Sequence, residues 1–310
     1  MDCLPLEFYF DVIHNFSASD LKEASELSAN SQWTRVSRIH GERRVEACVF
    51  LTYSVGQNAF TCVFSIGEDE FTFAETCRRE HLAYFRVKSV TMEKKTIRKN
   101  DRRFVIAEGA LDGIFAFIAS HFDRLPHSFE MLNEFPHFDR FLTALIPVDP
   151  LFFEVKLRYF KNDSSCCSDF LKSQLTKRIQ RLHLYGNWPT TINEEIGGFV
   201  EKCWTDPSYR LSCLVADNTA IVLSFDRFKQ LLAEPRALSP RMRRRPFAFV
   251  VKVEVSFEEA MHHVAELLGE IPPEEMSNPF HFSVEHATIS VERKSSRFVK
   301  TILSSGHSVM

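Results

Sequence analysis

The stretch RLHLYGNWPTTINEEIGGFVEKCWT, residues 181–205, contains the unit from which most of this chain is built. Its first six residues alternate polar and apolar side chains, which is the period of a strand with one buried face. Asn193 is a suitable N-cap for a helix that follows. One apolar face of that helix is formed by Ile196, Phe199, Val200, Cys203 and Trp204. The stretch therefore predicts a strand followed by an amphipathic helix.

Similar strand patterns recur on both sides of this unit. They fall at residues 84–92, 127–132, 152–160, 210–216, 247–255 and 280–286. The predicted strand starts at Phe153, Arg181 and Arg210 are 28 and 29 residues apart, within the period of leucine-rich repeats. Leu182, Leu184 and Asn187 give the spacing LxLxxN, in which the asparagine can bond the backbone at a bend. We therefore expect an α/β fold with a leucine-rich-repeat-like solenoid over residues 81–294, and a compact doubly wound α/β domain is the alternative.

The first 80 residues follow different periods. Residues 1–44 predict three short amphipathic helices, the first beginning near Pro5 and the third spanning residues 32–40 with Trp33, Val36 and Ile39 inward. Residues 45–80 predict an antiparallel hairpin or cap, because the stretch FTCVFSI alternates and SVGQN supplies a turn. Residues 295–310 are expected to form a flexible tail.

Composition excludes several classes of protein. The net charge is only -3, so there is no global field to attract nucleic acid or anionic lipid. The 10 glycines form no GxG and no phosphate-binding loop, and we expect no cofactor. The eight cysteines form no CxxC pair, which favours reduced thiols in the cytoplasm or nucleus. The longest charge-free apolar stretch, residues 113–122, is about half a membrane span, so no membrane segment is expected.

The sequence contains no strong catalytic or metal motif. His262 and Glu266 lie at i and i+4 on a predicted helix, but they do not form HExxH and lack a nearby third ligand. No GxSxG or paired-carboxylate motif is present, so we do not expect an enzyme, although a small-molecule enzyme is kept as a third hypothesis. The basic run Arg241–Arg245 could contact phosphates, and a solvated loop is its simpler interpretation.

The N-terminal stretch LPLEFYFDVIHNF, residues 4–16, holds many large apolar side chains that three short helices cannot bury alone. Leu4, Pro5 and Phe8, then Val12 and Ile13, Phe16, Asp20 and Leu21, Leu27 and Ser28, and Trp33 follow in the order of the F-box pattern. The chain thus resembles the expanded nematode families in which an F-box precedes an F-box-associated region. That resemblance implies a substrate-recognition subunit of an SCF-type ubiquitin ligase, which binds a Skp-type adaptor on a cullin scaffold and an unknown target protein.

The resemblance also implies the interface residues. The adaptor would contact Leu4, Pro5, Phe8, Val12, Ile13, Phe16, Leu21, Leu27 and Trp33. Strand residues that alternate with the core would face a target protein, as solenoids commonly do, namely Lys156, Arg158, His183 and Tyr185. The alternative is a non-catalytic interaction scaffold in which the N-terminal helices cap the next domain and have no role in ubiquitin transfer.

Overall fold

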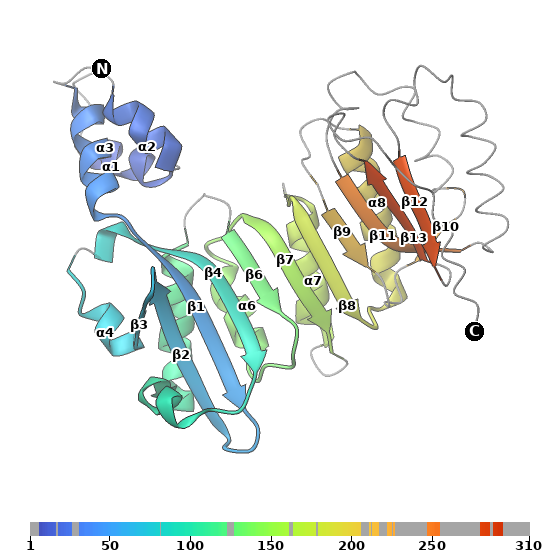
Figure 1. Cartoon of the computed structure of the whole chain (residues 1–310), viewed down its shortest axis with the longest axis horizontal. Coiled ribbons are helices and arrows are strands. Elements are labelled where there is room, and N and C mark those ends of the chain that lie inside the picture. The colour runs from blue at the N-terminus through green and yellow to red at the C-terminus, as the bar shows by residue number, and fades with distance from the viewer. Residues whose placement is uncertain are drawn as a thin grey trace. The chain divides into compact units, whose positions relative to one another are not determined.

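A computed structural model gives the fold of the chain (Figure 1). It describes residues 6–16, 18–26, 31–80, 82–122, 127–160, 164–177, 179–205, 211, 213–216, 222–224, 226, 247–254, 280–285 and 288–293. Backbone contacts divide the chain into two compact units, Met1–Phe170 and Leu171–Met310, and each unit is described by itself.

Unit 1 contains most of the described helices. They are α1 (Leu6–His14), α2 (Ala18–Ser25), α3 (Gln32–Arg43), α4 (Phe73–Cys77), α5 (Leu111–Ser120), α6 (Phe138–Leu145) and the first half of α7 (Ser164–Leu175). Three short 3-10 helices are η1 (Leu82–Tyr84), η2 (Lys99–Phe104) and η3 (Glu108–Ala110). The strands are β1 (Val45–Ser54), β2 (Ala59–Ile66), β3 (Asp69–Phe71), β4 (Phe85–Lys94), β5 (Val105–Ile106), β6 (His127–Met131) and β7 (Phe152–Tyr159).

The strands of unit 1 follow the order β7-β6-β4-β1-β2-β3. β1 and β2 form the predicted antiparallel hairpin, and β3 and β5 pair antiparallel with β2. β1 also pairs with β4 in parallel, and the parallel ladder continues to β6 and β7 in chain order. The hairpin therefore belongs to the same sheet as the strands that follow it.

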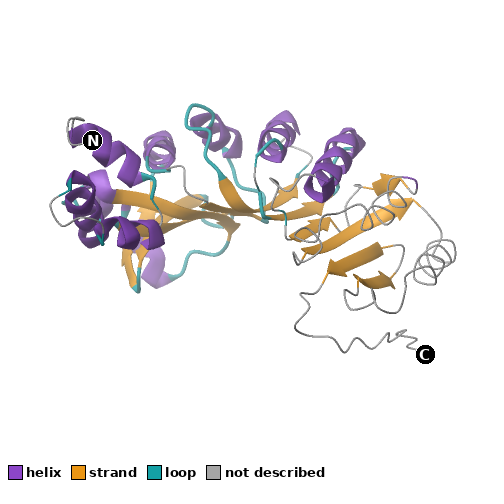
Figure 2. Cartoon of the chain, turned by 90° about the horizontal axis from the view of Figure 1, so that it is seen from above, coloured by secondary structure: helices purple, strands orange, loops and turns teal. Residues whose placement is uncertain are grey.

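The core of unit 1 lies between this sheet and the helices α5 and α6 (Figures 1 and 2). Buried and more exposed side chains alternate along the strands, because successive side chains point to opposite faces of the sheet. The inward side chains on β1 include Ala47, Val49 and Leu51. Aromatic rings fill the space between the layers: Phe129 of β6 stacks on Phe141 of α6 at 5.8 Å, and Phe141 meets Phe115 of α5 edge to face at 5.4 Å. Both helices thus cover the same face of the sheet.

Unit 2 contains the rest of α7, η5 (Thr190–Ile192), α8 (Asn193–Thr205), β8 (Arg181–Gly186), β9 (Cys213–Ala216), β10 (Val222–Ser224), β11 (Phe247–Glu254), β12 (Phe280–Glu285) and β13 (Thr288–Arg293). β8, β9 and β11 are parallel neighbours, whereas β13 joins β11 antiparallel and β12 joins β13 antiparallel. β10 pairs with the end of β11 in parallel. The apolar residues expected at the start of this unit are buried, including Leu182, Leu184, Ile196 and Phe199.

The predicted α/β class is confirmed, with a mostly parallel sheet in the described residues. Asn187, the asparagine of the LxLxxN spacing, is exposed just after β8, and Gly186, the last residue of that strand, has a positive φ of 81°. The pair His262 and Glu266, the basic run Arg241–Arg245 and the predicted tail 295–310 lie outside the described residues.

Candidate protein-binding surfaces

The three N-terminal helices enclose a small apolar core. Tyr9 and Ile13 of α1, Leu21 of α2 and Val36 of α3 are all buried in one cluster. Tyr9 and Ile13 are four residues apart, so they lie on the same side of α1 and face the other two helices. Ser31 caps α3 by accepting a hydrogen bond from the Thr34 backbone N–H at 3.1 Å. These helices form the helical module, residues 6–43, which has a core of its own.

Arg44 ties the end of α1 to the end of α3. Its guanidinium group donates hydrogen bonds to the carbonyl oxygens of Phe16, of Ile13 at 3.2 Å and of His14 at 3.4 Å. The last carbonyls of a helix have no partner within the helix, and they carry the negative end of its dipole. The Arg44 guanidinium donates hydrogen bonds to these carbonyl oxygens and places a positive charge at the negative end of the dipole. Arg44 therefore holds α1 in place.

A group of aromatic side chains lies at the edge of the module's core. Phe8 is 42% exposed, while Phe16 and Trp33 are half-buried and pack against the buried cluster. The ring of Trp33 stacks on Phe16 with centroids 6.2 Å apart, and it meets Phe8 edge to face at 6.4 Å. We call Phe8, Phe16 and Trp33 the aromatic edge.

The predicted adaptor residues fall into three groups. Phe8 is exposed, and Val12, Phe16 and Trp33 are half-buried. Ile13 and Leu21 are buried in the module's core, where they hold the helices together. Leu4, Pro5 and Leu27 lie outside the described residues.

The module contacts η1, the turn just before β4, through a buried histidine. His40 of α3 is 1% exposed, and its ring lies 4.9 Å from the ring of Tyr84 and 5.8 Å from that of His14. Burial, and then the nearby Arg44, His14 and Arg86, lower the pKa of His40 from 6.5 to about 4. The imidazole is therefore neutral at physiological pH.

The predicted target-binding residues lie on the strand faces that alternate with the core. In unit 1, Lys156 forms ion pairs with Glu130 of β6 at 3.0 Å and with Glu154 at 3.9 Å, and Arg158 is exposed. In unit 2, Tyr185 and His183 are half-buried, and His183 Nε2 lies 3.9 Å from the Cys213 Sγ of β9. On β7 and β8 these four side chains alternate with buried residues.

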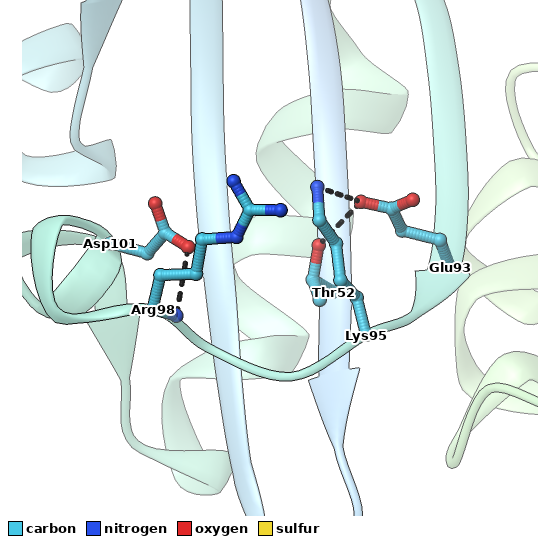
Figure 3. Close-up of polar contacts among 5 residues, drawn as sticks. All are labelled: Thr52, Glu93, Lys95, Arg98 and Asp101. Atoms are coloured by element: carbon cyan, nitrogen blue, oxygen red, sulfur yellow. Dashed lines mark hydrogen bonds and ion pairs between the residues drawn. The ribbon is translucent and has the colours of Figure 1, made fainter.

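Residues 94–103, KKTIRKNDRR, form a surface segment that the sequence analysis missed. We call this segment the basic strap. It begins at the last residue of β4, crosses the sheet and ends within η2, and Figure 3 shows Lys95 and Arg98 lying over the strands with the helices behind them. The density of positive charge in the sequence could have revealed it.

Two structural features bear on other kinds of site. Across the residues that the structure describes, no group of three or more His, Cys, Asp or Glu side chains is arranged to hold a metal ion. Within the same residues, every helix is too short or too polar to cross a membrane.

Comparison of the chain with models of known protein families, with curated proteins and with solved structures finds no match. The functional assignment therefore depends on the surfaces described above.

Proposed function

We propose that this protein is the substrate-recognition subunit of an SCF-type ubiquitin ligase, in which the helical module binds a Skp-type adaptor. The observation that carries the proposal is the aromatic edge. The module has already filled its own core, yet Phe8 remains 42% exposed beside Phe16 and Trp33. Clustered aromatic side chains at a surface are typical anchors of protein interfaces.

The arrangement of unit 1 supports a role in holding a second protein. Its parallel strands β1, β4, β6 and β7 are neighbours in chain order, and α5 and α6 cover one face. Solenoid proteins are arranged similarly: each strand-helix unit packs against the next, and the strand face that the helices do not cover binds the partner. We infer that the target protein binds this strand face, to which Lys156 and Arg158 belong. The cullin scaffold is reached through the adaptor, and the chain itself supplies no catalytic step.

One observation favours a second candidate, a scaffold with no ubiquitin role. Ile13 and Leu21 belong to the predicted adaptor set but serve the module's own core, and His40 packs the module on Tyr84. In this alternative the module is an end cap of unit 1. The two functions differ in whether the aromatic edge is covered by another protein.

Co-purification with a Skp-type adaptor tests the proposal. The full chain is co-expressed with the adaptor and the complex is measured by size-exclusion chromatography. We expect the wild type to co-elute and Phe8→Asp to lose the adaptor, because a carboxylate cannot be buried without a partner. Ile146→Asp is the matched control, since Ile146 is 74% exposed, lies in the same unit and belongs to no predicted interface.

The outcome decides between the two functions. Phe8→Leu should retain the adaptor, because it preserves the apolar contact, and far-UV circular dichroism should show all variants folded. If wild-type protein never co-elutes with the adaptor, or if Ile146→Asp loses it as completely as Phe8→Asp, the ligase assignment is wrong and the scaffold is favoured.

A further inference from the structure

The basic strap, residues 94–103, has the densest positive charge in the described part of unit 1. It contains six basic residues and one acid, Asp101. The described basic side chains in it, Lys94, Lys95, Arg98, Arg102 and Arg103, are all exposed. The single acid is already engaged, because an Asp101 carboxylate oxygen accepts the Arg98 backbone N–H at 3.0 Å.

Within the described part of the chain, several of these cations have no ion-pair partner. Lys95 lies 3.5 Å from Glu93, and Arg103 donates to the backbone carbonyl of Glu70 at 3.2 Å. Among the described residues, no carboxylate lies within ion-pair distance of Lys94, Arg98 or Arg102. The strap therefore keeps positive charge available for an external anion.

The strap is held firmly against the sheet. The Lys95 N–H donates to the carbonyl of Tyr53 at 3.1 Å, and the Gln57 side chain donates to the carbonyl of Ile97 at 3.3 Å. The side chains of Ile97 and Phe104 are buried beneath it. Because the backbone is fixed at these points, the cations lose less conformational freedom on binding than those of a loose loop would.

The strap borders an open strand face with an exposed aromatic ring. Phe50 of β1 is 38% exposed, on the face opposite to the one that α5 and α6 cover. Its partners in register are Val63 of β2 and Thr91 of β4, both half-buried. Thr52 is the next residue of β1 on this face, and it donates to Glu93, the same carboxylate that Lys95 contacts (Figure 3). Phe50 thus lies about 7 Å along the strand from the part of the face that the strap crosses.

We propose that the basic strap and Phe50 together bind an acidic segment of a partner polypeptide, whose carboxylates contact Arg98 and Arg102 and whose apolar side chain covers Phe50. The charges favour a peptide over nucleic acid. On the same face Glu93 pairs with Lys95, and Glu130 and Glu154 pair with Lys156, so the positive charge of the strap does not continue across the face for a polyanion to follow, whereas a peptide can place carboxylates only at the strap. This inference names a binding site for the target protein of the proposed function. It rests on that proposed function for the step that follows binding, the transfer of ubiquitin to the bound protein.

Binding of a defined acidic peptide to the full chain tests the inference. The probe is a fluorescein-labelled peptide with a central Leu-Phe pair flanked by glutamates, and fluorescence anisotropy measures its affinity. We expect Arg98→Glu combined with Arg102→Glu to weaken binding by at least about tenfold, because attraction becomes repulsion. Phe50→Ser should weaken it by about fivefold through the lost apolar contact.

The matched control is Arg35→Glu combined with Arg38→Glu, which makes the same change of charge at two exposed positions of α3. It should leave the affinity within about twofold, since it alters only the distant field. The inference is overturned if both double variants lose affinity equally, or if the wild type shows no saturable binding of the peptide. It is also overturned if a single-stranded oligonucleotide of the same length binds more tightly and depends on Arg98 and Arg102.

This test is separate from the test of adaptor docking. Phe8→Asp should bind the peptide normally, and the strap variants should retain the adaptor, because the two surfaces share no residue. Failure of the peptide experiment therefore leaves the adaptor result unchanged, and the reverse also holds.

Discussion

Acid should weaken the attachment of the helical module through His40. The ring is 1% exposed and faces His14 of α1 and Tyr84 of η1, with Arg43, Arg44 and Arg86 also near this joint. Its pKa is lowered to about 4, whereas the unfolded chain titrates near 6.5. Between these two values the unfolded chain binds the additional proton, so stability falls as the pH falls through this window.

The magnitude follows from the shift. Each pH unit in the window is worth about 1.4 kcal/mol for one group. Lowering the pH from 7 to 5 should therefore cost about 2 kcal/mol through His40 alone, and the loss should reach about 3 kcal/mol at pH 4. Well above pH 6.5 the imidazole is neutral in both states and contributes no pH dependence.

Hydrogen exchange of the α3 amides, residues 32–43, measures this loss near the ring. After correction for the intrinsic effect of pH, wild-type protection should fall by about 30-fold between pH 7 and pH 5. His40→Gln cannot titrate, so its protection should change far less over the same interval. His121 also has a pKa lowered by burial, and the comparison with His40→Gln removes its contribution.

Two results would refute this reasoning. One is an equal loss of protection in wild type and His40→Gln. The other is a carbon-labelled histidine resonance, assigned by its absence from His40→Gln, that titrates near 6.5 and so shows an ordinary imidazole.

Two further predictions concern stability, measured as the free energy of unfolding in urea with circular dichroism. Arg44→Met should cost about 2 kcal/mol, because the carbonyls at the end of α1 lose their donor, and a loss below about 0.5 kcal/mol would show that water replaces it. Gly113→Ala should stabilise α5 by up to about 1 kcal/mol, since an added Cβ meets no atom within 4 Å, whereas Gly67→Ala should destabilise by about 1 kcal/mol because its φ is +62°. Effects of the same sign at both glycines would contradict this explanation.

The helical module shows how far periodicity alone can predict a surface. The sequence placed Trp33, Val36 and Ile39 on the inner face of α3, and the structure buries Thr34, Val36, Ser37 and His40. The helix was predicted well because its spacing is local. The buried face of α3 is rotated from the predicted one because α3 packs on α1 and α2 and also on Tyr84. The spacing of apolar residues along one helix does not indicate that it has two packing partners.

The candidate surfaces divide in the same way. Alternation correctly predicted which side chains of β7 and β8 oppose the core, since strand geometry alone decides this. The helical spacing of α1 could not show that Ile13 would be buried while Phe8 stays exposed, because both residues fit the same apolar stripe of that helix. The basic strap was missed because it comes to lie across β1 only in the folded chain. The hydrogen bonds that hold it there join residues that are far apart in the sequence.

The amino-acid sequence by itself determined the α/β class, the three N-terminal helices, the first hairpin and the positions of most strands, because these follow from side-chain spacing over a few residues. Only the tertiary structure decided that the hairpin joins the parallel sheet through β1 and β4, and which aromatic side chains and cations remain at the surface. Strand pairing and burial depend on contacts between segments far apart in the chain, so the local period leaves them open.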